Sequence, residues 1–225
     1  MEQKSLYTAQ SGGVESILET NRVLKNTYML LSMTLLFSAM TAGLAMFLGL
    51  SYGVGMMMTL AAVGLIWFVL PRTANSTSGI YTVFAVTGLL GAGLGPILNH
   101  YLAMSNGPSI VMQAMGGTAI VFFGLSGYAL TTRKDFSYMA GFLVVGLLLA
   151  IVAGIVNIFL GIPAVSLALS AAIVLIMSGF ILFHTSAIIN GGERNYIIAT
   201  INLYMAIYNL FTSMLHLLAA FSGED

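Results

Sequence analysis

The sequence predicts an all-α integral membrane protein, a bundle of seven transmembrane helices with a cytoplasmic amino terminus and an external carboxyl terminus. Charged residues make up 6% of the 225 residues and hydrophobic residues 59%, with a mean hydropathy of +0.99, as is typical of membrane proteins. The sixty residues between Arg72 and Arg133 carry no charge, and neither do the fifty-seven between Asp135 and Glu193. Because a helix crosses the hydrocarbon core with about 20 apolar residues, each stretch is long enough for two or three spans.

Turn residues divide the chain into seven apolar segments. The predicted spans are residues 27–48, 54–70, 80–102, 110–131, 138–160, 165–189 and 197–221. Clusters of Gly, Pro, Asn, Ser or charged residues separate them at 49–53, 71–78, 105–108, 133–135, 161–163 and 190–195. These residue types favour turns through their backbone preferences, so each cluster predicts a connection between helices.

All seven basic residues then fall on one side of the membrane. They are Lys4, Arg22 and Lys25 before the first span, Arg72 after the second, Arg133 and Lys134 after the fourth, and Arg194 after the sixth. The other connections, and the tail after the seventh span, contain no Lys or Arg. Basic residues mark the cytoplasmic side, which gives the predicted orientation.

The predicted bundle, residues 25–225, follows a cytoplasmic tail, residues 1–24. Gly12 and Gly13 favour flexibility in the first half of this tail. Apolar residues in its second half recur at roughly helical spacing, which predicts a short interfacial helix running into the first span. A mostly disordered tail is the alternative. The tail lacks the pattern of a cleaved signal peptide, so we expect it to be retained.

Composition argues against several kinds of site. The chain has no cysteine, which excludes disulfides and thiolate chemistry. Its formal net charge is zero and its basic residues are dispersed, so we expect no nucleic-acid partner. His100, His184 and His216 lie on three different predicted spans without clustered carboxylates, so we expect neither a metal site nor a cofactor.

Polar side chains inside the spans form a candidate polar cavity. Several lie on the seventh span with spacings of three and four residues, within an arc of about 80°. Such a stripe faces either partner helices, through hydrogen bonds, or a hydrated cavity. The candidate residues are His184, Asn157, Asn202, Ala206, Asn209 and Ser213, with His216 continuing the stripe.

His184 is the most distinctive of these residues. It lies nine residues before Glu193, roughly 14 Å from that cytoplasmic turn at 1.5 Å per residue. An ionisable group at this depth is a functional candidate. The alternative is a neutral imidazole hydrogen-bonded to a neighbouring helix.

Residues 124–127 read Gly-Leu-Ser-Gly, the GxSG pattern of rhomboid-type intramembrane serine proteases. Ser126 paired with His184 would make chemical sense as a nucleophile and its base. However, Ser126 lies seven residues before the cytoplasmic Arg133, whereas rhomboids carry this motif near the external face. We therefore predict that the protein is not an enzyme.

Small residues on the spans predict close helix packing. Gly91, Gly93 and Gly95 lie on the third span, and Ala150 and Gly154 on the fifth, where the spacing lets helix backbones approach. Pro96, directly after Gly95, is expected to break or kink the third helix near its outer end.

Segments spread over the whole chain carry a family resemblance. They are NRVLKNTY at 21–28, GPILN at 95–99, GGTA at 116–119, TTRKD at 131–135, GGERNY at 191–196, LY at 203–204 and NLF at 209–211. On these segments the chain resembles the Bax inhibitor (TMBIM) superfamily, and most closely its bacterial, YccA-like branch. The resemblance implies seven helices in a bacterial inner membrane.

The resemblance implies two functions. The bacterial branch binds the membrane-anchored protease FtsH and restrains its degradation of membrane proteins. The tail, beginning Met1, Glu2, Gln3, Lys4 and Ser5, would then engage the protease. The alternative is a pH-sensitive calcium leak channel closed by two aspartates, whose positions here read His184 and Ala206. Because calcium prefers oxygen ligands, we expect no calcium binding at this pair.

Overall fold

A computed structural model gives the backbone of residues 2–223 and their side chains from Leu18 onward. Its helices are α1 (Glu2–Phe47), α2 (Tyr52–Gly64), the π-helix η1 (Leu65–Val69), α3 (Leu70–Thr73), α4 (Ser78–Leu102), α5 (Gly107–Thr132), the 3-10 helix η2 (Ser137–Met139), α6 (Ala140–Leu160), α7 (Pro163–Ile189) and α8 (Tyr196–Phe221).

The described part of the chain contains seven stretches long and apolar enough to cross a membrane. They are Leu18–Phe47, Tyr52–Thr73, Ser78–Leu102, Gly107–Thr132, Ser137–Leu160, Pro163–Ile189 and Tyr196–Phe221. Each overlaps one predicted span, so the number and order of the spans are confirmed. The first stretch begins at Leu18, the first residue whose side chain is described. Its helix, α1, runs without a break from Glu2 through the start predicted at residue 27.

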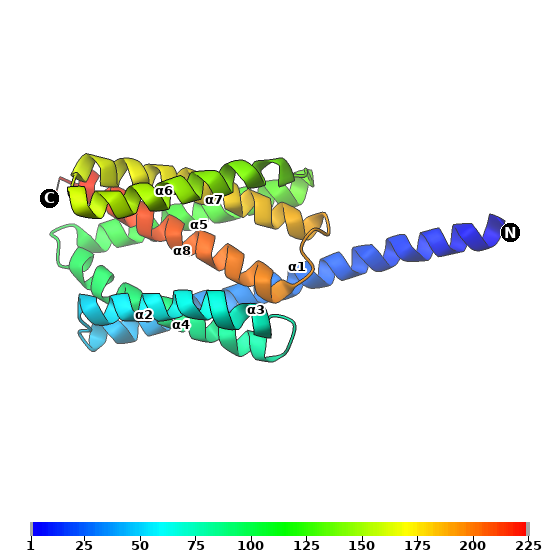
Figure 1. The fold of residues 1–225 in the computed structure, drawn as a ribbon, viewed down its shortest axis with the longest axis horizontal. Coiled ribbons are helices and arrows are strands. Elements are labelled where there is room, and N and C mark those ends of the chain that lie inside the picture. Colours follow the sequence, from blue (N-terminus) through cyan, green and yellow to red (C-terminus); the bar gives the residue numbers. More distant parts are fainter. Residues whose placement is uncertain (1, 224–225) are drawn as a thin grey trace.

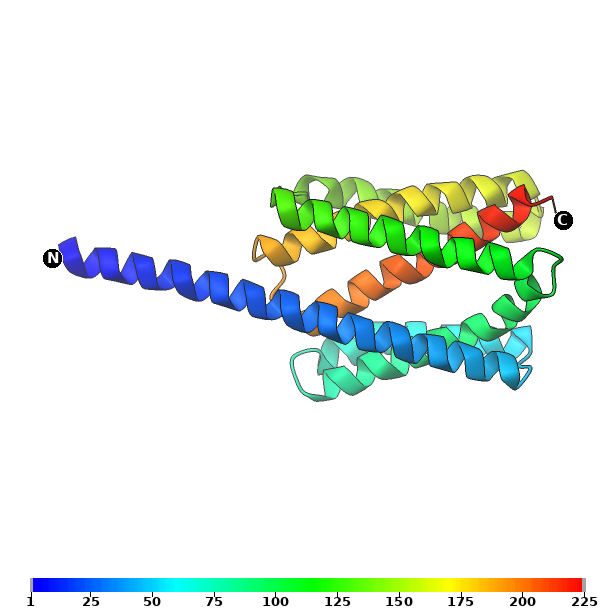
Figure 2. The same ribbon diagram turned by 180° about the vertical axis from the view of Figure 1, so that it is seen from behind.

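The helices form two layers with α8 between them. Figures 1 and 2 show α1, α2 and α4 on one side and α5, α6 and α7 on the other, while α8 crosses obliquely and contacts helices of both layers. Leu203, Tyr204 and Leu210 of α8 are fully buried in the core. By contrast, α6 lies at the edge against α7 and η2, and most of its large apolar side chains are exposed. These side chains face lipid when the bundle is in a membrane.

Glycines of α4 let α1 and α2 approach closely. A Cβ added to Gly91 would overlap the backbone carbonyl oxygen of Ser38 on α1, and one added to Gly95 would lie 2.5 Å from Ala45 Cβ. This confirms the packing role predicted for that segment. No atom lies within 4 Å of a Cβ placed on Gly154, so the contact predicted there is absent. The physical reason is the peripheral position of α6.

Two of the four prolines, Pro71 and Pro96, lie beyond the first turn of their spans, and neither ends its helix. α4 runs through Pro96 to Leu102, so the break predicted at Pro96 does not occur. The second span was predicted to end before Pro71 but continues to Thr73. Proline lacks an N–H and clashes with the carbonyl of the preceding turn. The π-helix directly before Pro71 lengthens that turn, which lets the span continue.

The amino-terminal part of α1 projects beyond the bundle (Figure 1). The short helix predicted in the tail is therefore part of α1, and the helix continues through Gly12 and Gly13; Met1 lies outside the described residues. The ion pair between Arg194 Nη1 and Glu19 Oε2, at 3.8 Å, joins this region to the α7–α8 connection. Both side chains are more than half exposed, so the pair contributes at most about 1 kcal/mol. Flexibility of the tail stays a prediction.

The orientation of the bundle also stays a prediction, and a fusion tests it. The basic connections and the projecting amino-terminal part of α1 lie at one end of the bundle, and the carboxyl-terminal end of α8 lies at the other (Figure 1). A reporter fused after Asp225 should be active only outside the cytoplasm. Alkaline phosphatase and green fluorescent protein fusions at this position provide complementary readouts. Cytoplasmic activity would contradict the orientation derived from the basic residues.

Candidate functional site

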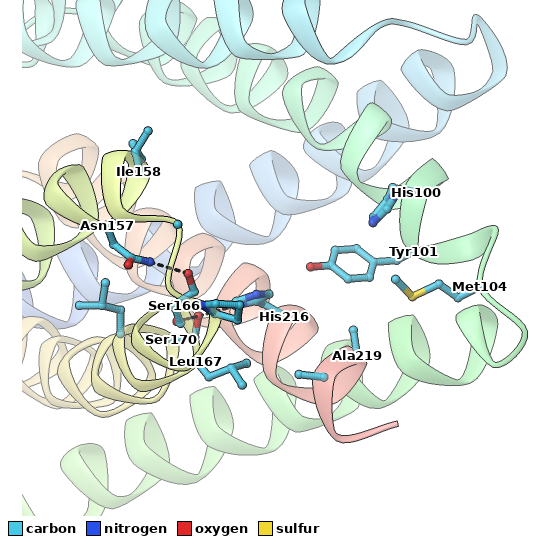
Figure 3. Close-up of a pocket in the computed structure, with 15 residues that line it drawn as sticks. His100, Tyr101, Met104, Asn157, Ile158, Ser166, Leu167, Ser170, His216 and Ala219 are labelled. Carbon is cyan, nitrogen blue, oxygen red and sulfur yellow. Dashed lines mark hydrogen bonds between the residues drawn. The ribbon is translucent and has the colours of Figure 1, made fainter. Parts of the chain in front are cut away.

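A cavity of about 790 Å³ lies between the ends of α4, α6, α7 and α8 (Figure 3). It is at the end of the bundle predicted to face outside, and we call it the outer cavity. Its polar lining residues are His100, Tyr101, Asn157, Ser166, Ser170 and His216. Among the described residues, no Asp, Glu, Lys or Arg lines it. Its chemistry therefore comes from imidazole, hydroxyl and amide groups.

Asn157 closes the connection between α6 and α7. Its Nδ2 donates to the Ile162 carbonyl at 3.2 Å and to Ser166 Oγ at 2.7 Å, and its Oδ1 accepts from the Ile162 N–H at 3.2 Å. Gly161, with φ of 62°, ends α6 in the left-handed region that glycine adopts readily. Both donors of the Asn157 amide are occupied, so this side chain holds the wall of the cavity in place.

Ser170 and His216 join α7 to α8. Ser170 Oγ lies 3.0 Å from the Ser166 carbonyl oxygen and 2.8 Å from His216 Nδ1. A serine has one proton to donate. When Ser170 donates it to His216 Nδ1, the neutral imidazole carries its own proton on Nε2. His216 Nε2 is then left without a protein partner among the described residues.

Tyr101 and His100 form the opposite wall. Their ring centroids lie 5.5 Å apart in an edge-on contact, and His100 makes a second edge contact with Tyr52 at 6.2 Å. Figure 3 shows the Tyr101 hydroxyl pointing across the cavity toward α7 and α8. Neither Tyr101 nor His100 makes a hydrogen bond through its side chain to another described residue.

The structure separates the six candidate residues taken from the sequence. Only Asn157 lines the outer cavity. On α8, Ala206 and Ser213 are buried, Asn202 is half-buried, and Asn209 Nδ2 donates to the Met205 carbonyl of its own helix at 2.8 Å. Sequence reasoning missed Ser166 and Ser170 of α7. Their spacing of four residues, which places both on one face of the helix, was the available signal.

His184 lies away from the outer cavity. It is half-buried on α7, where it stacks on Phe180 with centroids 5.5 Å apart and meets Phe183 edge-on at 5.1 Å. The GxSG serine, Ser126, lies with its Oγ 3.4 Å from Thr185 Oγ1. Its hydroxyl partner is thus Thr185, whereas a serine protease would need a pairing with the imidazole.

Comparison with known proteins gives one consistent family. Residues 20–223 match the family described as inhibitor of apoptosis-promoting Bax1. The chain is 51% identical over 216 residues to an uncharacterized membrane protein of Vibrio cholerae, covering 96% of this chain and 97% of that protein. It is 50% identical over 210 residues to a protein of Escherichia coli K12 named modulator of FtsH protease YccA, covering 93% and 94%. A Pseudomonas aeruginosa protein is 45% identical over 223 residues, covering 99% and 100%.

Proposed function

We propose that this chain, which belongs to the Bax inhibitor family and is a multi-pass inner-membrane protein, binds the membrane-anchored protease FtsH and restrains its degradation of membrane proteins. The observation that carries the proposal is the identity of 50% over 93% of the chain to a protein named modulator of FtsH protease. The match extends through all seven spans, so it concerns the whole bundle.

Competition for the protease is a mechanism that fits the fold. The tail, beginning Met1, Glu2, Gln3, Lys4 and Ser5, offers an ATP-dependent protease a segment to engage. Residues 2–24 of the tail are the first part of α1, so a pull on the tail acts on the rest of this helix. Gly91 and Gly95, which have no side chain, let α4 pack closely against this helix. The protease would then hold a protein that it extracts slowly, and other membrane proteins would be degraded less.

This mechanism requires no catalysis by the chain. The family is described as an inhibitor and the E. coli relative as a modulator. Ser126, the nucleophile of the GxSG pattern, is buried against Thr185. We therefore propose a binding protein that acts on the protease without an active site of its own.

Co-purification tests the association. The tagged chain is solubilised in mild detergent from membranes that contain FtsH, purified, and its partners are identified by mass spectrometry. We expect FtsH to be recovered well above the amount found with an unrelated seven-span protein carrying the same tag. Recovery equal to that control would overturn the proposed association.

The leak-channel alternative leads to an expected negative result. His184 and Ala206 occupy the positions where the resemblance places two acids, and neither side chain supplies a carboxylate oxygen. Calcium-loaded vesicles that contain the purified protein should release calcium no faster than calcium-loaded vesicles without protein. The release is measured with an external calcium dye. A His184→Asp, Ala206→Asp double variant should gain flux that neither single variant has. Rapid release by the unmodified protein would replace the modulator function with a channel.

A further inference from the structure

We propose that the outer cavity binds a phosphate group, namely the headgroup phosphate of a phospholipid in the outer leaflet of the membrane. The inference is independent of the proposed action on FtsH, because it rests on the lining of the cavity alone. Four side chains carry it: His100, Tyr101, Ser166 and His216 (Figure 3).

These side chains have hydrogen-bonding capacity that the protein leaves unused. Ser166 Oγ accepts from Asn157 Nδ2 at 2.7 Å, so its own proton is available to donate. The Tyr101 hydroxyl points into the cavity, and His216 presents an Nε2–H donor when its Nδ1 accepts the proton of Ser170. Tyr101, Ser166 and His216 are half-buried and His100 is exposed. Half-buried polar groups without partners cost free energy, which a ligand with several acceptor oxygens would recover. A phosphate group has that set of oxygens.

The lining of the cavity is compatible with an anion. Among the described residues, no carboxylate lines it, so none of them places a negative charge against a phosphate there. The two imidazoles, His100 and His216, are on opposite walls (Figure 3), and each can donate a hydrogen bond from a ring N–H to a phosphate oxygen. A cation would find no carboxylate here, and no group of three or more His, Cys, Asp or Glu that could hold a metal exists among the described residues.

The depth of the outer cavity in the membrane and its apolar lining residues favour a lipid headgroup over free phosphate as the ligand. Ser170 lies seven residues inside the start of α7 at Pro163, about 10 Å at 1.5 Å per residue, which is the depth where headgroups meet acyl chains. Leu167, Leu169 and Ile158 also line the cavity. Ile158 is 78% exposed on the lipid-facing helix α6, so the cavity borders the bilayer there. A glycerol backbone and its first methylene groups would cover these side chains.

Cysteine labelling of the full-length protein tests the site, because the chain contains no cysteine. Leu167→Cys places a thiol on the cavity wall, and Ser109→Cys places one at an exposed outer position that does not line it. The rate of reaction with a membrane-impermeant maleimide is measured in vesicles of phosphatidylglycerol and of a phosphate-free galactolipid with the same acyl chains. A third sample is galactolipid vesicles with inorganic phosphate.

We expect phosphatidylglycerol to slow labelling at position 167 by at least about fivefold relative to galactolipid, as occupancy of a site protects it, with no change at position 109. Adding His100→Gln, which removes no hydrogen bond of the protein, should abolish most of this protection; His216→Gln should do the same. Equal rates in the two lipids would overturn the proposal. Equal protection by inorganic phosphate would overturn the lipid as the source and assign the cavity to free phosphate.

Discussion

Replacing Gly91 with valine is expected to destabilise the bundle by about 2–3 kcal/mol, the upper range for overpacking a well-packed interior. A side chain at this position would overlap the Ser38 carbonyl and the Thr41 hydroxyl of α1. Because the Ser38 obstacle is backbone, a change of rotamer cannot relieve the overlap, and α1 must move away from α4. The displacement would also disturb Ser38 Oγ, which lies 2.6 Å from the Tyr204 hydroxyl of α8. A lowered midpoint of thermal unfolding in detergent measures the effect.

Gly116→Val is the matched control for this substitution. Gly116 lies in the middle of a long helix as Gly91 does, but a Cβ there meets no atom within 4 Å. Valine costs no more than glycine in a helix interior, so the unfolding midpoint should stay the same or rise slightly. If both variants unfold at the same temperature, the result would contradict the close packing of α1 against α4 at Gly91.

Deleting residues 2–20 is expected to lengthen the lifetime of the protein in cells severalfold. An ATP-dependent protease must engage a segment before it can extract a helix, and the deletion removes that segment. Arg22 and Lys25 remain to hold the orientation. The lifetime is followed after protein synthesis is stopped, in cells with active FtsH and in cells lacking it.

The deletion also removes Glu19, so Glu19→Gln in the full-length chain serves as the control. This substitution breaks only the exposed ion pair with Arg194, and we expect it to leave the lifetime unchanged. A deletion variant degraded as fast as the intact chain, with FtsH active, would remove the tail from the mechanism.

The seven spans could be predicted because length and hydropathy decide which segments cross a membrane. Their ends were harder to place. Pro71 and Pro96 read as helix breaks, yet a π-helix precedes the first and α4 continues through the second. Whether a proline ends a helix depends on how the neighbouring turns and helices accommodate it.

The sequence alone did not predict which helices pack against each other or which of their side chains are in contact. Gly91 and Gly154 are the same residue type within similar small-residue patterns, but only Gly91 packs against another helix. The pairing of Ser170 with His216 joins residues 46 positions apart, and periodicity says nothing about which helices are neighbours. A polar stripe likewise does not distinguish a partner helix from a cavity. Of the six candidate residues only Asn157 lines the outer cavity, and His216, which continues the predicted stripe, lines it as well.

Degradation by purified FtsH in vesicles tests the central claim most directly. The protease, a membrane-protein substrate and ATP are combined with increasing amounts of this chain, and loss of the substrate is followed over time. Restraint by competition predicts that substrate loss slows as the chain is added, and that the variant lacking residues 2–20 slows it much less. A substrate lost at the same rate at every concentration of the intact chain would contradict the account.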